Sequence, residues 1–262
     1  MFDAKTAITV ATFLQRVGTA RASVLLLDYD GTLAPFNVDR SQAYPYPGVT
    51  SILETIIQRR KTRVVILSGR PILELRALLA PIDSIEMWGA HGMEHQSSDG
   101  SSSRFQVSEE NAASLEEAEK WVVAAGLRSS AEIKPGGIAI HWRGFSLVEA
   151  RRVEYLTRQG WTPLAQGSGL KLLPFEAGLE LRVSNPNKGD VVRSIVAGLG
   201  SSVPVAFLGD DITDEDAFDA LDGNGLSVLV KENYRETRAE AWIRPPDELL
   251  ALLEGWLRSV SG

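Results

Sequence analysis

The sequence predicts an α/β fold, in which helices cover a parallel β-sheet and a smaller α+β unit is inserted into the chain. Three observations predict it. Short apolar runs alternate with segments whose apolar residues recur at helical spacing, a pattern typical of parallel sheets. A Ser-rich stretch at residues 97–103 interrupts this alternation, and different patterning follows it. The first pattern later resumes, so we expect one unit from residues 1–103 and 184–262, interrupted by a second at residues 104–183.

The composition is that of an acidic globular protein. Of the 262 residues, 44% are hydrophobic and 23% are charged, which predicts a packed core. The formal net charge of -7, without a long basic run, argues against binding to nucleic acid or to an anionic membrane. Because cysteine is absent, disulfides, thiolate zinc sites and cysteine nucleophiles are excluded. Gln15 and Arg16 interrupt the apolar positions of residues 1–20, so we expect no signal peptide, no membrane span and a cytoplasmic location.

The first unit is expected to carry the parallel sheet. Before the insertion, its expected elements are a helix at 7–17, strands at 24–27, 64–67 and 85–88, a loop at 34–48, and helices beginning at 49 and 71. After it, they are a helix beginning at 188, strands at 205–208 and 225–230, and a helix at 246–260. The inserted unit is expected to have helices at 109–125 and 147–159 and strands at 138–142, 170–173 and 179–183. Helices on one side of strands with alternating faces predict an α+β unit there.

The apolar strand at residues 24–27 ends in two aspartates one residue apart, Asp28 and Asp30. Side chains at i and i+2 share a face of a strand, so the two carboxylates repel each other and lose hydration. A divalent cation is the simplest compensation, although an ordinary Asp-rich turn is the alternative. Gly31 then lets the backbone turn where a side chain would crowd such a site.

Two other apolar strands also end in polar residues, namely Ser68 and Asp210. Sites in open parallel sheets form outside the carboxyl ends of the strands, so folding is expected to bring these residues to Asp28. Lys188, at the start of a helix, adds a cation where backbone N–H groups also favour anions. This set is typical of phosphoryl transfer on Mg²⁺.

The expected reaction uses Asp28 as the nucleophile and proceeds through an aspartyl phosphate. Asp30 would protonate the leaving oxygen and then take a proton from water, with its carboxyl off the metal and its backbone carbonyl on it. Ser68 would donate to a phosphate oxygen and Lys188 would supply positive charge. Taken singly, each piece also has an ordinary structural interpretation: residues 68–71 as a plain turn, Arg70 as a surface residue, and the acidic residues from Asp214 as a helix start.

Taken together, four segments resemble the motifs of the haloacid dehalogenase superfamily of phosphotransferases. They are Asp28-Tyr29-Asp30-Gly31-Thr32-Leu33, Ser68-Gly69-Arg70, Lys188 and Gly209-Asp210-Asp211, in the order expected for that superfamily. The longer run from Gly209 to Phe218 resembles the trehalose-6-phosphate phosphatase family in particular. The same family is indicated by Gly89-Ala90-His91-Gly92-Met93-Glu94, by Lys134 with His141-Trp142-Arg143, and by Glu180-Leu181-Arg182.

This resemblance implies a Rossmann-like core of the haloacid dehalogenase type with an inserted α+β cap, and Mg²⁺-dependent hydrolysis of trehalose 6-phosphate. It places Mg²⁺ on Asp28, Asp210 and the Asp30 carbonyl, with Asp211 and Asp214 acting nearby through water or through neighbouring ligands. The residues expected to bind substrate are Gly69, Arg70, His91, Lys134, His141, Arg143 and Glu180.

The inserted unit leaves alternatives open. Lys134 and Arg143 can instead be solvated, and His141 can be structural. Trp142 and Trp161 can stack on a sugar or belong to the core. The segments 132–137 and 173–177 depart from the family pattern.

Rival functions also stay open. They are a phosphatase for another glycosyl phosphate, such as sucrose or glucosylglycerol phosphate, a phosphomutase, and a non-catalytic sugar-phosphate sensor. We expect a small-molecule sugar phosphate as the partner, and a monomer.

Overall fold

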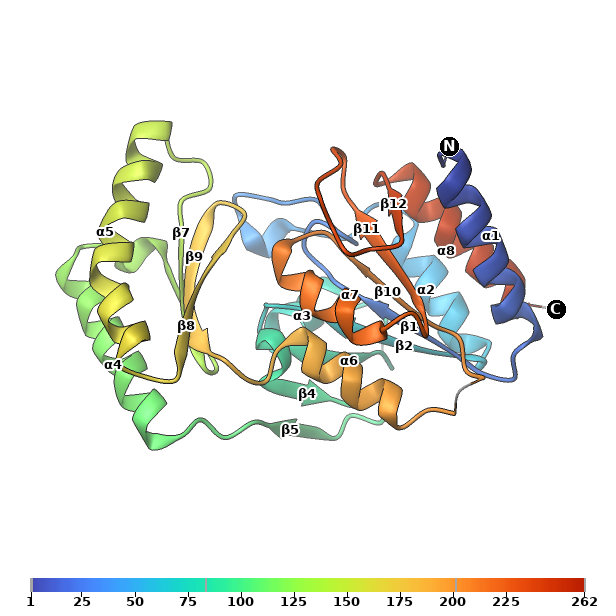
Figure 1. The fold of residues 1–262 in the computed structure, drawn as a ribbon, viewed down its shortest axis with the longest axis horizontal. Coiled ribbons are helices and arrows are strands. Elements are labelled where there is room, and N and C mark those ends of the chain that lie inside the picture. Colours follow the sequence, from blue (N-terminus) through green and yellow to red (C-terminus); the bar gives the residue numbers. More distant parts are fainter. Residues whose placement is uncertain (1, 83, 201, 262) are drawn as a thin grey trace. The chain divides into compact units, whose positions relative to one another are not determined.

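A computed structural model describes residues 2–82, 84–200 and 202–261, and the chain divides into two compact units (Figure 1). One unit comprises residues 1–103 and 188–262, and the other comprises residues 104–187. The second boundary therefore lies at residue 187, not at the expected 183. The reason is local, because Ser184 donates a hydrogen bond to the Gly169 carbonyl and Arg182 donates one to the Pro186 carbonyl. The assignment of these units as catalytic core and specificity cap stays a prediction.

Within the described part of the first unit, eight strands form one sheet in the order β12-β11-β10-β1-β2-β3-β4-β5. The strands are β1 (Ser23–Leu27), β2 (Thr62–Leu67), β3 (Glu86–Gly89), β4 (Glu94–Gln96), β5 (Ser102–Arg104), β10 (Val205–Gly209), β11 (Leu226–Val230) and β12 (Ala241–Ile243). All neighbours from β12 to β3 are parallel, and β4 runs antiparallel to β3. The α/β fold predicted from the alternation of elements is confirmed.

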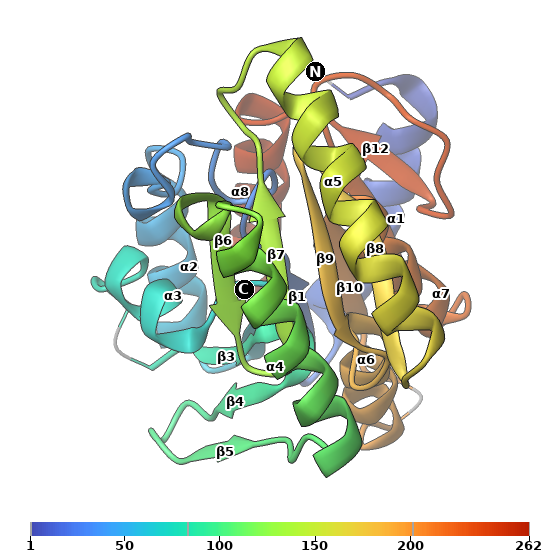
Figure 2. The same cartoon turned by 90° about the vertical axis from the view of Figure 1, so that its left-hand side faces the viewer.

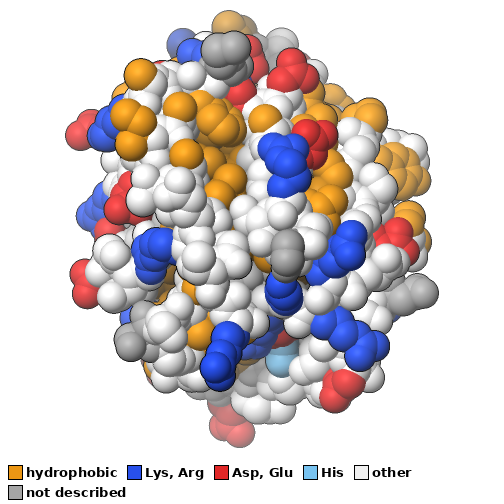
Figure 3. Space-filling view, turned by 90° about the vertical axis from the view of Figure 1, so that its right-hand side faces the viewer, with side chains coloured by type: hydrophobic (Ala, Val, Ile, Leu, Met, Phe, Trp, Pro, Cys, Tyr) orange, Lys and Arg blue, Asp and Glu red, His pale blue; other side chains and the backbone are white. Residues whose placement is uncertain are grey.

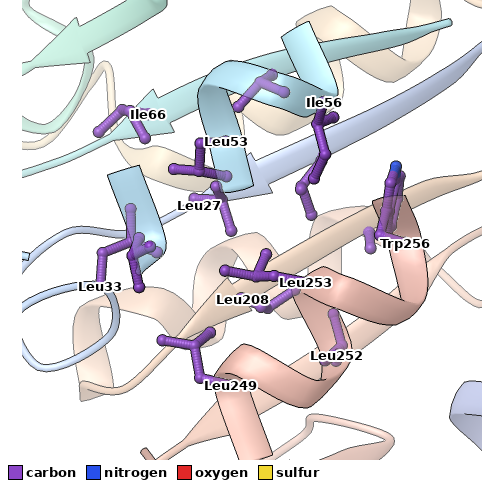
Figure 4. Close-up of a cluster of buried hydrophobic side chains, with 14 of the residues drawn as sticks. Leu27, Leu33, Leu53, Ile56, Ile66, Leu208, Leu249, Leu252, Leu253 and Trp256 are labelled. Carbon is purple, nitrogen blue, oxygen red and sulfur yellow. The ribbon is translucent and has the colours of Figure 1, made fainter. Parts of the chain in front are cut away.

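Helices cover both faces of this sheet. They are α1 (Ala4–Thr19), α2 (Val49–Gln58), α3 (Ile72–Leu78), α6 (Lys188–Ala197), α7 (Glu215–Leu221) and α8 (Asp247–Val260). Side chains alternate along β1, so Leu25 and Leu27 pack with α1, α2, α3 and α8, whereas Val24 and Leu26 pack with α6 and α7. Both faces of β1 are therefore buried, as its unbroken apolar run predicts. Figure 4 shows Leu27 and Leu208 of the sheet among Leu53, Leu253 and Trp256 of the covering helices.

The strand ends that carry the polar residues are neighbours in the sheet. Leu27 of β1 pairs with Leu208 of β10 on one side and with Ile66 of β2 on the other. The residues that follow these strands, Asp28 and Asp210 among them, consequently emerge along one edge.

The second unit is a four-stranded antiparallel sheet in the order β6-β7-β9-β8, with two helices against one of its faces (Figure 2). The strands are β6 (Ala131–Lys134), β7 (Gly137–His141), β8 (Leu170–Phe175) and β9 (Gly178–Val183), and the helices are α4 (Glu109–Ala124) and α5 (Leu147–Gln166). The sequence predicts a turn at residues 135–137 and no strand before it. In the structure, residues 135–136 are the hairpin turn that joins β6 to β7, and Gly137 already pairs with Lys134.

Helix α5 is longer than the sequence indicates. We expected it to end at Gln159, before Gly160 and Pro163, but it continues to Gln166. Packing explains the difference. Trp161 is completely buried, and Gly160 lies so close to the Trp121 ring that a Cβ there would be 2.1 Å from Cε2. Tertiary contacts thus override the low helix propensity of Gly and Pro.

Basic side chains are scattered over the face of the molecule that Figure 3 draws. Figure 3 shows the face turned to the right in Figure 1, where Lys and Arg side chains stand as separate patches with neutral surface between them. Such spacing is unlike the continuous basic stripe that tracks a nucleic-acid backbone. Among the described residues, no helix combines the length and apolar character needed to span a bilayer.

The packing of α8 leads to a stability prediction. Leu253 is completely buried against the sheet, so Leu253→Ala should lower the free energy of unfolding by about 2–5 kcal/mol, through lost burial and a residual cavity. Urea denaturation measures this. Glu254→Ala, at the exposed neighbouring position, should change it by less than about 0.5 kcal/mol. Equal losses in the two variants would contradict the packing described here.

Candidate active site

A lysine lies between two carboxylates at the centre of the site. Lys188, the first residue of α6, places its Nζ 2.5 Å from Asp28 Oδ1 and 2.6 Å from Asp214 Oδ1. Thr32 Oγ1 donates to the other oxygen of Asp28 at 3.0 Å. All four side chains are buried. Buried charges are stable only when paired, so this lysine holds together residues from three separate segments of the chain.

Asp210 joins the same group. Carboxylate oxygens of Asp28, Asp210 and Asp214 all lie within 4.8 Å of one another. The close approach needs Gly31, which has φ +84°, because a Cβ there would lie 2.4 Å from the Asp210 carboxylate. Lys231 Nζ stands 3.3 Å from Asp210 Oδ2 and is the second ammonium at the cluster.

The donor set fits a hard divalent cation. It consists of carboxylate oxygens, the ligands that Mg²⁺ prefers, and their negative charge exceeds that of the two neighbouring ammonium groups. Asp214 is already engaged, since Oδ1 accepts from Lys188 and Oδ2 accepts the backbone N–H groups of Asp210 and Asp211. Asp28 and Asp210 are therefore the better candidates for direct ligands, with Asp214 orienting them.

Burial changes the acid–base behaviour of the group. It raises the pKa of Asp28 to about 7, with Lys188 opposing the rise and Asp214 adding to it. Burial likewise raises the pKa of Asp210, and the Asp28 charge adds to that effect. For Lys188, burial lowers the pKa, but Asp214 and Asp28 more than offset it and leave the pKa above its usual value. The lysine is therefore charged, while Asp28 needs a further positive charge to ionise fully at neutral pH.

Asp30 is held apart from this cluster. Its carboxylate receives two hydrogen bonds from Arg70, from Nε at 2.6 Å and from Nη2 at 2.7 Å. Arg70 is only 2% exposed and also donates to the Arg40 carbonyl at 2.9 Å and to Glu74 at 3.3 Å. The fork geometry fixes the Asp30 carboxyl in one orientation and keeps it off the acidic cluster.

The turn after β2 brings Ser68, Gly69 and His91 together. Ser68 Oγ accepts the Arg70 N–H at 3.1 Å, and the Ser68 carbonyl accepts the His91 N–H at 2.9 Å. His91 has a left-handed backbone (φ 58°), and its ring lies against Gly69, where a Cβ would be 2.6 Å from Nε2. The imidazole is therefore set directly beside this turn.

Along the strands of the second unit, polar and charged residues alternate with apolar ones. Those on one face of the sheet form a charged network. Lys134 contacts Glu180 at 2.7 Å and Glu132 at 3.8 Å, and His141 contacts Glu132 at 2.8 Å. These positions face one another across β6, β7 and β9, since Glu132 pairs with Ala139 and Ala139 pairs with Glu180. The set presents several donors and acceptors side by side, as binding of a polyhydroxylated ligand requires.

Comparison with known proteins identifies the family. The sequence profile described as trehalose-phosphatase matches residues 26–241. The chain belongs to the trehalose-phosphatase family. It is 30% identical to a trehalose-phosphate phosphatase of Mycobacterium leprae, over 85% of this chain and 54% of that protein. It is 27% identical to a probable trehalose-phosphate phosphatase C of Arabidopsis thaliana, over 92% of this chain and 78% of that protein. The chain thus spans little more than half the length of the mycobacterial relatives.

Solved structures agree on the fold. A C. albicans trehalose-6-phosphate phosphatase C-terminal domain superposes with a TM-score of 0.82 at 20% identity, covering 95% of this chain and 96% of that one. A haloacid dehalogenase-like hydrolase from B. subtilis gives a TM-score of 0.61 at 16% identity, covering 88% and 99%. The predicted fold class is therefore confirmed, and the profile match confirms the resemblance to the trehalose-phosphatase family.

The structure also gives the contacts of Asp211 and Arg143, whose proposed roles stay predictions. The Asp211 carboxylate lies outside the acidic group and accepts the Ile212 N–H at 2.7 Å, because it caps the short turn that follows it. Arg143 donates to the Glu176 carbonyl at 3.0 Å. Trp161 is a core residue, as its complete burial shows, and Trp142 is half-buried.

Four residues at these sites were not singled out from the sequence. The sequence indicates Thr32 and Glu132 only weakly as site residues: Thr32 lies within the first motif, and Glu132 lies two positions before Lys134. Lys231, and Arg235, which donates to the Asp210 carbonyl, had no such signal, because they lie in a polar segment whose charges are typical of ordinary surface.

The close approach of Gly31 to Asp210 can be tested by substitution. Gly31→Ala should lower the free energy of unfolding by more than Gly223→Ala, because both glycines have positive φ but only Gly31 has a carboxylate in the way. The matched Gly223 variant, with open space around it, should lose about 1–2 kcal/mol. Urea denaturation of both variants measures the difference. Similar losses would show that the Asp210 carboxylate yields without cost.

The raised pKa of Asp28 predicts pH-dependent metal binding. Below about pH 7 the metal-free protein holds a proton on Asp28, and this proton must leave before the carboxylate can ligate Mg²⁺. Because the pKa of Asp210 is raised as well, the Kd for Mg²⁺, measured by titration calorimetry, should rise by at least roughly tenfold per pH unit below 7. Asp28→Asn should bind more weakly and flatten this slope. A wild-type Kd that is constant from about pH 5.5 to 7.5 would contradict the prediction.

Proposed function

We propose that the protein is a Mg²⁺-dependent phosphatase that hydrolyses trehalose 6-phosphate to trehalose and phosphate through an aspartyl phosphate on Asp28. The observation that carries this is the buried Asp28, set between Lys188 and the carboxylates of Asp210 and Asp214. Family membership and the printed names of the relatives support the substrate.

Asp28 is the proposed nucleophile. Lys188 and Thr32 fix its two oxygens, so the carboxylate is oriented before the substrate arrives. Bound Mg²⁺ supplies the charge neutralisation that lets a carboxylate and a phosphate approach each other. An Asp28 oxygen then bonds to phosphorus while the bond to the sugar oxygen breaks.

Two further groups stabilise the phosphoryl charge in this scheme. Lys188 carries the positive charge nearest to the nucleophile, and its pKa above the usual value keeps it protonated. The Ser68 hydroxyl, whose oxygen accepts the Arg70 N–H, has its own proton to donate to a phosphate oxygen.

Asp30 is the proposed acid and base. It gives a proton to the leaving sugar oxygen, then takes one from the water that attacks the aspartyl phosphate and releases phosphate. Arg70 holds its carboxyl off the acidic cluster, which this role requires. The Asp30 carbonyl as a metal ligand stays a prediction.

Sugar recognition is proposed for the charged network of the second unit, with Lys134, His141 and Glu180 on the sugar hydroxyls and Glu132 holding the first two in place. Gly69 and His91 are proposed to contact the substrate from the turn after Ser68. Cytoplasmic location and a monomeric state stay predictions from the sequence.

A panel of glycosyl phosphates, read by phosphate release, tests the proposal. Trehalose 6-phosphate should turn over with the highest kcat/KM, a chelator should stop turnover, and added Mg²⁺ should restore it. Asp28→Asn should abolish release, because the amide is neither a nucleophile nor an anionic ligand. Asp216→Asn, the same change at an exposed position, should leave the activity intact.

Other outcomes select the rival functions. Faster release from sucrose or glucosylglycerol phosphate would replace the substrate. An isomerised sugar phosphate would indicate a mutase, and binding without turnover would indicate a sensor.

A further inference from the structure

Residues 231–239, which follow β11, contact the loop that carries Asp210. We call these residues the clamp segment. Its Arg235 donates from Nε to the Asp210 carbonyl at 3.2 Å and from Nη2 to the Asp211 carbonyl at 2.8 Å. Asp214 Oδ2 accepts the N–H groups of the same two residues, at 2.9 and 3.0 Å. The backbone around Asp210 is thus fixed on its carbonyl side by Arg235 and on its amide side by Asp214.

Glu215 anchors the clamp segment to the start of α7. Its carboxylate pairs with Arg235 Nη1, accepts the Thr237 hydroxyl at 2.8 Å, and accepts the Arg238 N–H at 2.8 Å. The Arg235 and Glu215 side chains are 21% and 19% exposed, so the pair is largely shielded from water. These acceptors together fix the position of the Arg235 guanidinium.

Lys231 acts on Asp210 from the same segment but in a different way. Its Nζ lies 3.3 Å from Asp210 Oδ2, the carboxylate itself, and the side chain is 26% exposed. Its own backbone is held at both polar groups, since the N–H donates to the Ile243 carbonyl and the carbonyl accepts Trp242 Nε1. A positive charge is therefore kept at the position where it lowers the negative potential of the acidic cluster.

We propose that the clamp segment sets the Mg²⁺ affinity of the site, with Arg235 as a positioning residue that strengthens binding and Lys231 as a counter-charge that weakens it. This rests on the proposed Mg²⁺ site. The two effects have opposite signs because Arg235 touches only the backbone of the ligand loop, whereas Lys231 competes with the cation for the carboxylate. Within the clamp segment, Arg235 thus fixes the backbone of the ligand loop, while Lys231 holds the affinity below what the carboxylates would give without it.

The test is titration calorimetry of Mg²⁺ on the full chain, without substrate. Arg235→Gln should raise the Kd by roughly tenfold or more, as is usual when a group that orients a metal ligand is lost. Arg235→Lys keeps the charge but loses the fork, and should fall between that variant and wild type. Lys231→Gln should lower the Kd by roughly threefold or more, through the lost repulsion.

Arg238→Gln is the matched control. Arg238 lies three residues further along the clamp segment and also pairs with a carboxylate of α7, but that carboxylate belongs to Asp219 and not to the ligand loop. The Kd of Arg238→Gln for Mg²⁺ should stay within about twofold of that of the wild type. Unfolding midpoints without Mg²⁺ identify any variant that fails to fold; if Arg235→Gln fails, Arg235→Lys and Lys231→Gln decide the outcome.

An Arg235→Gln Kd equal to that of Arg238→Gln would overturn the positioning role, and weaker binding by Lys231→Gln would overturn the counter-charge. Failure of the wild type to bind Mg²⁺ would overturn the proposed function and the clamp together. Normal wild-type binding with unchanged variants would overturn the clamp alone.

Discussion

The structure of the site depends on the contact of one buried ammonium group with two buried carboxylates. Lys188 lies between Asp28 and Asp214, and without it the interior would hold several negative charges with little to balance them. The surrounding residues serve this cluster. Gly31 makes room for Asp210, Thr32 completes the hydrogen bonds of Asp28, and Asp214 gives its second oxygen to backbone N–H groups. Some negative charge is left over, and this excess suits a divalent cation.

The parallel sheet makes such a cluster possible. Strands β10, β1 and β2 are adjacent and end at the same edge, so residues far apart in sequence emerge within reach of one another. Helices on both faces bury these strands, which removes water and strengthens every electrostatic contact at their ends. The burial that shifts the pKa of Asp28 is therefore a property of the fold and not of the motif alone.

Much of the fold and of the site could be predicted because it rests on local patterns. The apolar runs at β1 and β10 and the helical spacing of α2 and α8 each specify an element without reference to the rest of the chain. Features that depend on distant partners could not be predicted. Helix α5 continues past Gly160 because Trp121 packs on it.

The site shows the same limit at Arg235. This residue lies near the ligand loop only because β11 and β10 are neighbours, and its own sequence context is that of solvated charge. Asp211 shows the converse. It follows Asp210 directly in the motif, but its carboxylate accepts a hydrogen bond from the Ile212 N–H. Neither placement is visible without the three-dimensional arrangement.

The insertion of the second unit has a consequence for synthesis of the chain. Asp28 and Ser68 are made before it, whereas Lys188 and Asp210 are made after it, and 160 positions separate Asp28 from its ammonium partner. On the ribosome, the amino-terminal strands are therefore without β10, the neighbour of β1, until the inserted unit has been translated. The inserted unit, whose sheet and helices come from one continuous stretch, can fold during that interval. The nascent core meanwhile keeps the edge of β1 unpaired, which makes it the stage at which a chaperone would be most useful.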